Sequence, residues 1–242
     1  MQYIDAHCHL SDNVDLDAVL TRASECGVRR LCCNAAQFSD WNHIVSMVRH
    51  YPQVCGAIGV HPWYISSVPN NWLERLQTLL AENPDLMIGE IGLDKNRPDI
   101  TTQQDMFIAQ LHLAHKMGRG VSVHCVGMWD LLFRILHTHC DTLPRFLILH
   151  SYSGPTTDME KLSERFNLYY SYGPRSIRAR RFADLVLHTP VARILLESDA
   201  DNPEIIPTVS IAIADKLNLA PAHLADIIYH NTIRILPDGQ IA

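Results

Sequence analysis

The amino-acid sequence predicts an α/β fold, a single (β/α)8 TIM-like barrel, and three observations lead to this prediction. Short apolar runs alternate with longer amphipathic stretches along the whole chain. About eight such pairs fit within 242 residues, close to the roughly 250 residues of a typical barrel of this class. Polar side chains directly follow most of the apolar runs, as they do at the carboxyl ends of barrel strands. We therefore expect residues 1–242 to form one domain.

Eight short runs rich in Val, Ile, Leu, Tyr and Cys have the length and composition of buried parallel strands. Strands that alternate with helices form a parallel sheet, and eight strand–helix units favour a closed barrel over an open doubly wound sheet. The expected strands are Tyr3–His7, Arg29–Asn34, Val54–Val60, Leu86–Ile91, Val121–His124, Phe146–His150, Leu168–Tyr172 and Arg193–Ser198.

The stretches between these strands carry helical patterns and helix-terminal signals. Leu16–Cys26 is expected to form the first helix. Thr101 and Gln104 match a capping box, which predicts that a helix begins there ahead of a run of regularly spaced apolar residues. After Asn218 we expect one further helix, and then fraying over residues 237–242.

The composition is that of a globular protein with a sizeable core, since 47% of residues are hydrophobic and 19% are charged. A formal net charge of −6 argues against a nucleic-acid binder that relies on bulk positive charge, although metal ions and a few arginines can bind phosphate locally. Seven cysteines without a CxxC pair fit a reducing compartment. With no secretory signal and no apolar run near about 20 residues, we expect a cytoplasmic protein without a membrane partner.

Side chains that can bind metal follow apolar runs that lie far apart in the sequence. Because the carboxyl ends of barrel strands converge on one rim, these side chains are expected to meet there. His7 and His9 are two residues apart, and on an extended strand both imidazoles face the same side. Five or more ligands exceed the needs of one tetrahedral ion, which predicts two divalent cations, of zinc, manganese or magnesium, with Glu90 between them. The expected ligands are His7, His9, Glu90, His124, His150 and Asp199.

Six ordered blocks of sequence resemble the motif series of the TatD family of metal-dependent deoxyribonucleases, which belongs to the amidohydrolase-type barrels. The resemblance covers essentially the whole chain, and both the order and the spacing of the blocks fit the family. A lone HxH motif would be a weak signal, whereas the complete series is a strong one. The blocks are Asp5–His9 (DAHCH), Gly59–Pro62 (GVHP), Gly89–Asp94 (GEIGLD), Val123–His124 (VH), Leu149–Gly154 (LHSYSG) and Leu196–Asp199 (LESD).

The resemblance implies how the ligands are shared between the two metals. The two histidines of the first block would bind one metal, which Asp199 completes. His124 and His150 would bind the second metal, and Glu90 would bridge the pair. Family members usually carry His-x-Arg after the fifth strand, where this chain has Val126. Metal-dependent hydrolysis is therefore implied more directly than deoxyribonuclease specificity.

The mechanism that we expect is hydrolysis by metal-activated water. Asp199 lies beside that water as a metal ligand and is the candidate for moving its proton, with Glu90 as the second catalytic acidic residue. His61 shares the same rim and is assigned to the substrate phosphate, as both a catalytic and a substrate-binding residue. Residues 173–181 contain four arginines, and Arg175 and Arg178 are expected to contact phosphate in place of the missing family arginine.

Three functions are compatible with these residues. The leading one is a divalent-metal-dependent deoxyribonuclease with exonuclease-like action on ends or single strands, with DNA favoured over RNA as the nucleic acid partner. The second is metal-dependent hydrolysis of a small-molecule ester, amide or lactone. The third is a metal-binding subunit of a larger assembly, against which the retention of both Glu90 and Asp199 argues. The sequence leaves open whether the protein is a monomer or part of a larger assembly.

Overall fold

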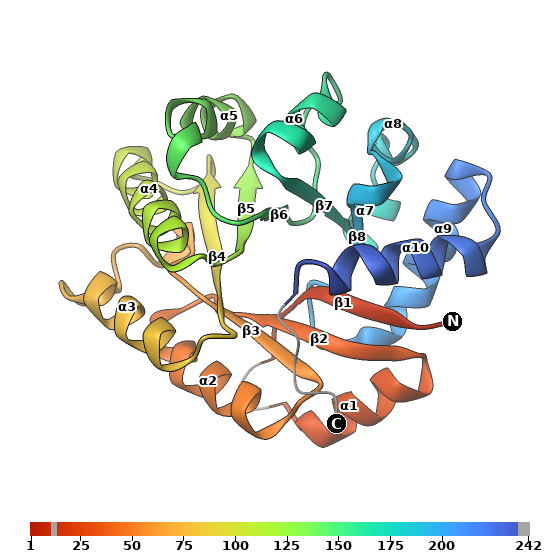
Figure 1. Cartoon of the computed structure of the whole chain (residues 1–242), viewed down its shortest axis with the longest axis horizontal. Helices are drawn as coiled ribbons and strands as arrows, with labels where there is room; N and C mark the ends of the chain where they lie inside the picture. The colour runs from red at the N-terminus through yellow and green to blue at the C-terminus, as the bar shows by residue number, and fades with distance from the viewer. Residues whose placement is uncertain (11–13, 237–242) are drawn as a thin grey trace.

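A computed structural model describes residues 1–10 and 14–236 of the chain. Eight parallel strands form one sheet in the order β1 to β8, so that neighbours in the sheet are also neighbours in the sequence. Helices lie outside the strands and surround them (Figure 1). The predicted (β/α)8 barrel is confirmed. The expected fraying of residues 237–242 concerns a segment outside the described residues.

The strands match the eight predicted apolar runs, with bounds that differ by up to a few residues. They are β1 Tyr3–Cys8, β2 Val28–Asn34, β3 Val54–Ile58, β4 Met87–Asp94, β5 Val121–Val126, β6 Leu147–Leu149, β7 Leu168–Tyr172 and β8 Ile194–Leu196. After β8 the chain returns to β1, where the Asp199 amide donates a hydrogen bond to the His7 carbonyl oxygen at 3.0 Å. This contact brings the two ends of the sheet together.

Helices follow the strands and cover the outer face of the barrel (Figure 1). They are α1 Leu16–Glu25, α2 Trp41–His50, α3 Trp72–Glu82, α4 Ile100–Met117, α5 Trp129–Thr138, α6 Met159–Phe166, α7 Pro174–Ile177, α8 Phe182–His188, α9 Ile206–Leu217 and α10 Pro221–Ile233. Short 3-10 turns precede or follow several of them, including η1 Phe38–Asp40 and η2 Pro62–Tyr64. The helix expected after Asn218 is α10.

The predicted capping box of α4 is wrong. The helix begins at Ile100, and its N-cap is Asp99, whose carboxylate accepts a hydrogen bond from the Thr102 amide at 3.3 Å. Thr101 therefore lies inside the first turn, and Gln104 lies past the position at which a capping box would place it. A carboxylate at the N-cap also interacts favourably with the positive end of the helix dipole, which favours Asp99 over Thr101 in this role.

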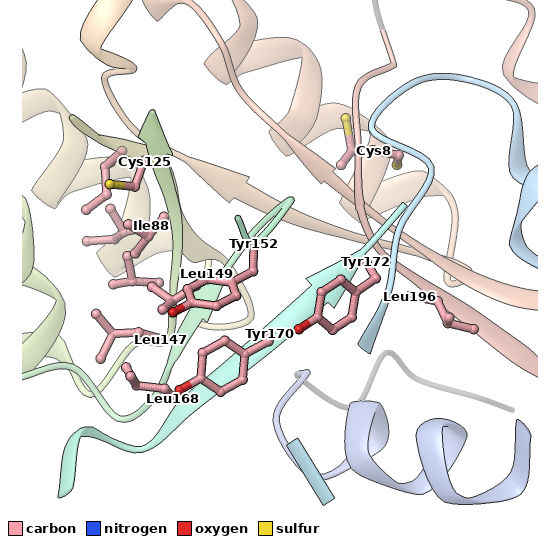
Figure 2. Packing of buried hydrophobic residues seen from close by; sticks show 14 of the residues in the cluster. Cys8, Ile88, Cys125, Leu147, Leu149, Tyr152, Leu168, Tyr170, Tyr172 and Leu196 are labelled. Atoms are coloured by element: carbon pink, nitrogen blue, oxygen red, sulfur yellow. The ribbon is translucent and has the colours of Figure 1, made fainter. Parts of the chain in front are cut away.

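Two apolar clusters fill the barrel and its outer shell. In the outer shell, the rings of Tyr152, Tyr170 and Tyr172 lie close to one another beside β7 (Figure 2), and the Tyr170 hydroxyl accepts a hydrogen bond from Ser163 of α6 at 3.1 Å. Inside the barrel, residues of seven strands, including Ile4 and Ala6 of β1, contact one another beneath the carboxyl ends. The inner residues of the other six strands are Cys32, Cys55, Ala57, Met87, Ile148, Tyr169 and Leu195. The inner face is largely apolar below the carboxyl end of the barrel, where the ligand-type side chains lie.

No helix in residues 1–10 and 14–236 is long and apolar enough to cross a membrane. All seven cysteines are free thiols, and five of them are buried. Cys8 and Cys125, which neighbour predicted metal ligands in the sequence, are among the buried ones and pack in the outer cluster.

Candidate metal centre

The six predicted ligands meet at the carboxyl end of the barrel. Alternation along the strands puts polar residues directly above the inner apolar cluster, so that His150 follows Ile148 on the inward face and Glu197 follows Leu195. Three overlapping groups of ligand atoms each lie within 4.8 Å of one another. The groups are His7, His150 and Asp199; His7, His9 and Glu90; and His61, Glu90 and His124. Every predicted ligand belongs to at least one group.

The first cluster of ligand atoms faces one oxygen of Glu90. Glu90 Oε2 lies 3.5 Å from His7 Nε2 and 3.4 Å from His9 Nε2. Asp199 Oδ1 lies 4.0 Å from the same atom of His7 and 3.6 Å from that of His9. Two imidazoles and two carboxylates thus surround one point, which is a donor set suited to a divalent cation such as zinc or manganese.

The second cluster faces the other oxygen of the same carboxylate. Glu90 Oε1 lies 2.7 Å from His124 Nδ1, 3.0 Å from His150 Nε2 and 3.4 Å from His61 Nε2. Glu90 therefore lies between two sets of imidazoles and presents one oxygen to each. A carboxylate in this position has the arrangement of a group that bridges two metal ions.

Hydrogen bonds from neighbouring strands orient the first two histidines. His9 Nδ1 lies 2.9 Å from the Asn34 carbonyl oxygen, which can only accept, so His9 carries its proton on Nδ1 when neutral. His7 Nδ1 lies 2.9 Å from Ser122 Oγ. The two Nε2 atoms are then left 3.2 Å apart and facing each other. The Nε2 lone pairs of His7 and His9 and the nearby carboxylates are donors that a cation can bind. The chemistry of this donor set therefore fits a metal site.

Two acidic residues support the second pair of histidines. Asp94 Oδ2 lies 3.3 Å from His124 Nε2, on the side of the ring away from Glu90. Glu197 Oε2 lies 3.7 Å from His150 Nδ1. Carboxylates in this position orient a ligating imidazole and raise its basicity. Asp94 closes the GEIGLD block of the sequence, and its contact with His124 places it in the site.

Burial and neighbouring charges shift the pKa values of the ionisable groups in the centre in opposite directions. Burial alone would raise the pKa of Glu90, but the charge of His150 and hydrogen bonds from His124, His150 and His61 hold that pKa well below its usual value. Burial would lower the pKa of His9, whereas Glu90 and Asp199 raise it to about 9. The same opposition raises the pKa of His150, through Glu90 and Glu197. The carboxylates therefore attract positive charge into a buried site.

Asp199 reaches the centre through an unusual backbone conformation. Its φ of 55° lies in the left-handed region, which costs a non-glycine residue about 1 kcal/mol. The hydrogen bond from its amide to His7 and one from the Ser198 amide to Asp5 Oδ1, at 3.0 Å each, hold the turn in place. The turn directs the carboxylate over the barrel mouth instead of along β8.

A cavity of about 470 Å³ opens above the metal centre. Arg175, on α7, lies at its edge with its guanidinium 3.5 Å from Asp199 Oδ2. Arg178 is exposed and is not among the residues that line the cavity. A second cavity of about 230 Å³ shares Arg175 and two of the ligands and is bordered by Val126, where the family arginine would stand. Residues lining the first cavity include His9, His61, Trp63, Glu90 and Asp199.

The structure refines the sequence-based assignments in three places. His61, assigned to substrate phosphate, lies among the possible ligands of the second cluster as well as in the cavity wall. Asn34 and Ser122 were not identified from the sequence, although both hydrogen-bond a predicted ligand. For Ser122, the available signal was its place on the inward face of β5, two residues before His124. Asn34 makes its contact through the main-chain carbonyl, which the residue type does not reveal. Arg178 is not brought to the other site residues.

Comparison with known proteins supports the sequence resemblance. A sequence model of the family described as TatD related DNase matches residues 4–237. The uncharacterized metal-dependent hydrolase YjjV of Escherichia coli K12 is 30% identical over 210 residues, which cover 82% of this chain and 79% of that protein. The 3'-5' ssDNA/RNA exonuclease TatD of Citrobacter koseri is 30% identical over 220 residues, which cover 88% of this chain and 83% of that protein.

Solved structures agree with the fold. The crystal structure of YjjV, a TatD homologue from Escherichia coli K12, superposes with a TM-score of 0.89 at 26% identity and covers 97% of both chains. The crystal structure of a TatD family hydrolase from Entamoeba histolytica superposes with a TM-score of 0.86 at 18% identity, covering 98% of this chain and 99% of that one. The whole barrel is thus shared with these proteins.

Proposed function

Because this chain belongs to the family of TatD related DNases and is a metal-dependent hydrolase, we propose that it cleaves phosphodiester bonds of DNA with two divalent cations held around Glu90. The observation that supports two cations is the placement of Glu90, whose Oε2 faces His7 and His9 while its Oε1 faces His61, His124 and His150. The relatives named as ssDNA/RNA exonuclease and deoxyribonuclease support a nucleic acid substrate. We favour DNA over RNA and an exonuclease-like action.

The residues of the first cluster would hold one cation, and those of the second cluster the other. Four imidazoles with two carboxylates suit zinc or manganese, and the carboxylates also admit magnesium. When bound, such cations supply positive charge that activates water and stabilises the negative charge of a phosphate under attack. His61 Nδ1 accepts a hydrogen bond from the Trp63 amide, so the neutral ring carries its proton on Nε2 and would contact the phosphate as a donor.

The chain's own residues would position the substrate and move the proton. Asp199 Oδ2 faces the cavity beside Arg175, so this carboxylate can accept a proton from the attacking water. The guanidinium of Arg175 can then pair with a non-bridging phosphate oxygen at the rim. Asp94 and Glu197 keep the second pair of imidazoles in place while charge changes at the phosphate.

A substrate panel tests this function. The enzyme, loaded with manganese, zinc or magnesium, is offered end-labelled single-stranded DNA, RNA of the same sequence, and small carboxylic esters and lactones. We expect release of mononucleotides from DNA, faster than from RNA, and loss of this activity with chelator and in Asp199→Asn. Cleavage of the small esters without cleavage of any oligonucleotide would contradict the proposal and favour the small-molecule alternative.

A further inference from the structure

We infer that Trp63 is the platform on which a nucleobase of the substrate stacks beside the metal centre. This inference rests on the proposed nuclease function and identifies a residue that selects unpaired bases. Trp63 lies in η2, two residues after His61, and lines the 470 Å³ cavity together with Glu90 and Asp199. An unpaired base offers an open aromatic face, whereas bases inside a duplex have both faces covered by their neighbours.

Trp63 is exposed where an indole would ordinarily be covered. Its exposed fraction is 47%, and it is one of four large hydrophobic residues that are exposed in the described part of the chain. The other three are Met1, Leu187 and Ile211, none of which lines this cavity. An exposed aromatic ring at the edge of a site marks a surface that is available to a ligand.

Hydrogen bonds hold the indole in a fixed orientation. Its Nε1–H donates to Asp94 Oδ2 at 2.6 Å, and the Trp63 amide donates to His61 Nδ1 at 3.1 Å. Asp94 is itself fixed, because its Oδ1 accepts from the Asn96 amide at 2.8 Å. A ring that is already immobile loses little conformational entropy when a flat base binds to it.

The indole lies close to the imidazoles of the second cluster without being stacked on them. Its ring centroid is 5.4 Å from that of His61 and 6.5 Å from that of His124. The interplanar angles are 83° and 76°, so neither imidazole lies face to face with the indole. A base on this ring would belong to a nucleotide whose phosphate can reach the metal centre.

Arg97 adds a positive charge at the same place. Its guanidinium lies 4.3 Å from the centroid of the Trp63 ring, and its side chain is exposed. With Arg97 in this position, the exposed fraction of Trp63 is still 47%. Sites for single-stranded nucleic acid combine aromatic rings for bases with arginines that stack or pair with phosphate. Trp63 and Arg97 reproduce this combination at the cavity edge.

The test compares a single-stranded DNA with the same strand carrying one abasic residue at the nucleotide being released. One base stacked on an aromatic ring contributes a factor of about 5 to 150, so wild type should cleave the intact strand with a kcat/KM about tenfold higher. In Trp63→Leu this ratio should fall to about one. In Trp63→Phe, which keeps an aromatic face but lacks the Nε1–H, most of the ratio should persist. Trp72→Leu, at the start of α3 and outside the cavity, is the matched control and should retain the wild-type ratio.

A second measurement does not depend on cleavage. Thymidine 5'-monophosphate, but not inorganic phosphate, should quench tryptophan emission in the metal-loaded wild type, and Trp63→Leu should abolish this quenching. The metal content of each variant is measured to separate loss of stacking from loss of metals through Asp94. An unchanged intact-to-abasic ratio in Trp63→Leu, or no quenching by the nucleotide, would overturn the inference. Failure of wild type to cleave any oligonucleotide contradicts the nuclease function instead, and the quenching still decides the role of Trp63.

Discussion

At the scale of single residues, Glu90 organises the centre because its two oxygens serve two different groups of histidines. A side chain with one ligand atom in this place could support only one of the groups. The carboxylate is buried, and its negative charge is opposed mainly by imidazoles. Such a buried charge is costly unless positive charge lies beside it, which is what bound cations would provide.

Replacing Glu90 by glutamine should therefore affect both metal sites at once. Glu90→Gln keeps the shape of the side chain but removes its charge, so metal content should fall towards one ion or none per chain. Activity should drop by about a thousandfold, since two-metal sites contribute several kcal/mol to the transition state. Elemental analysis and kinetics on labelled DNA measure the two effects. Glu82→Gln, at the exposed end of α3, is the control, and full metal content in Glu90→Gln would disprove the bridging role.

The rim arginines should differ in their effects. Arg175 borders the cavity, whereas Arg178 does not, so Arg175→Ala should raise the KM for DNA by about threefold to fivefold and Arg178→Ala by less. Loss of one phosphate contact should also reduce the salt dependence of binding to a single strand, by about 0.7 in the slope of log affinity against log salt. Equal effects of the two substitutions on the KM for DNA would show that the place of Arg175 at the cavity edge does not matter for substrate binding.

At the scale of elements, the strands and the residues directly after them carry the site, while α10 packs against the barrel beside β8. Asn231, 2% exposed on α10, donates from Nδ2 to the carbonyl oxygens of Val191 at 2.8 Å and Ile194 at 3.1 Å. Ile194 begins β8, the strand that precedes Asp199. The helix thus supports the position of a site residue that it does not touch.

Removal of the hydrogen bonds from Asn231 should lower the free energy of unfolding, with little direct effect on the rate of hydrolysis. Asn231→Ala leaves two carbonyl oxygens without their donor in a buried setting, which costs about 2 kcal/mol. For a protein of this size the thermal midpoint should fall by about 4–8 °C. Differential scanning calorimetry measures the shift, and His230→Ala, exposed on the same helix, is the control. A midpoint equal to that of wild type would mean that other contacts hold α10 on β8.

At the scale of the whole molecule, the barrel has a largely apolar interior, and its carboxyl end carries polar groups that can bind cations. The inner cluster occupies the barrel beneath these polar groups. Carboxylates and imidazoles from β1, β4, β5, β6 and the turn after β8 are consequently gathered at the carboxyl ends. Any cation that binds there links strands on opposite sides of the ring.

Metals should therefore stabilise the whole protein, and more strongly at higher pH. Cations at a hundred times their Kd add about 2.7 kcal/mol, so chelation should lower the thermal midpoint. Protons compete for the same imidazoles, and the pKa of His9 near 9 means that a metal must displace a proton there at neutral pH. Metal affinity should thus fall as pH is lowered from 9 to 6, with proton release seen by calorimetry in buffers of different ionisation enthalpy. A midpoint insensitive to chelator, or an affinity that is constant over this range, would argue against a stabilising metal site.

The sequence alone determined the fold class and the approximate bounds of the eight strands, because these depend on the local pattern of apolar residues. It also indicated the candidate metal ligands, because they follow the apolar runs in the order of the family motifs. His7 and His9 could be placed on one face by their spacing alone. That one domain spans residues 1–242 stays a prediction.

Only the tertiary structure decided how the residues meet. His7 and Ser122 are 115 positions apart and come into contact because barrel closure sets the height of each strand relative to the others. The same closure places Asp94 between His124 and Trp63 and separates Arg175 from Arg178 at the cavity edge. The left-handed turn that aims Asp199 depends on hydrogen bonds to β1, far away in the sequence. Which side chains from different strands meet at the site is therefore decided by strand packing, because local spacing fixes only the face of its own strand.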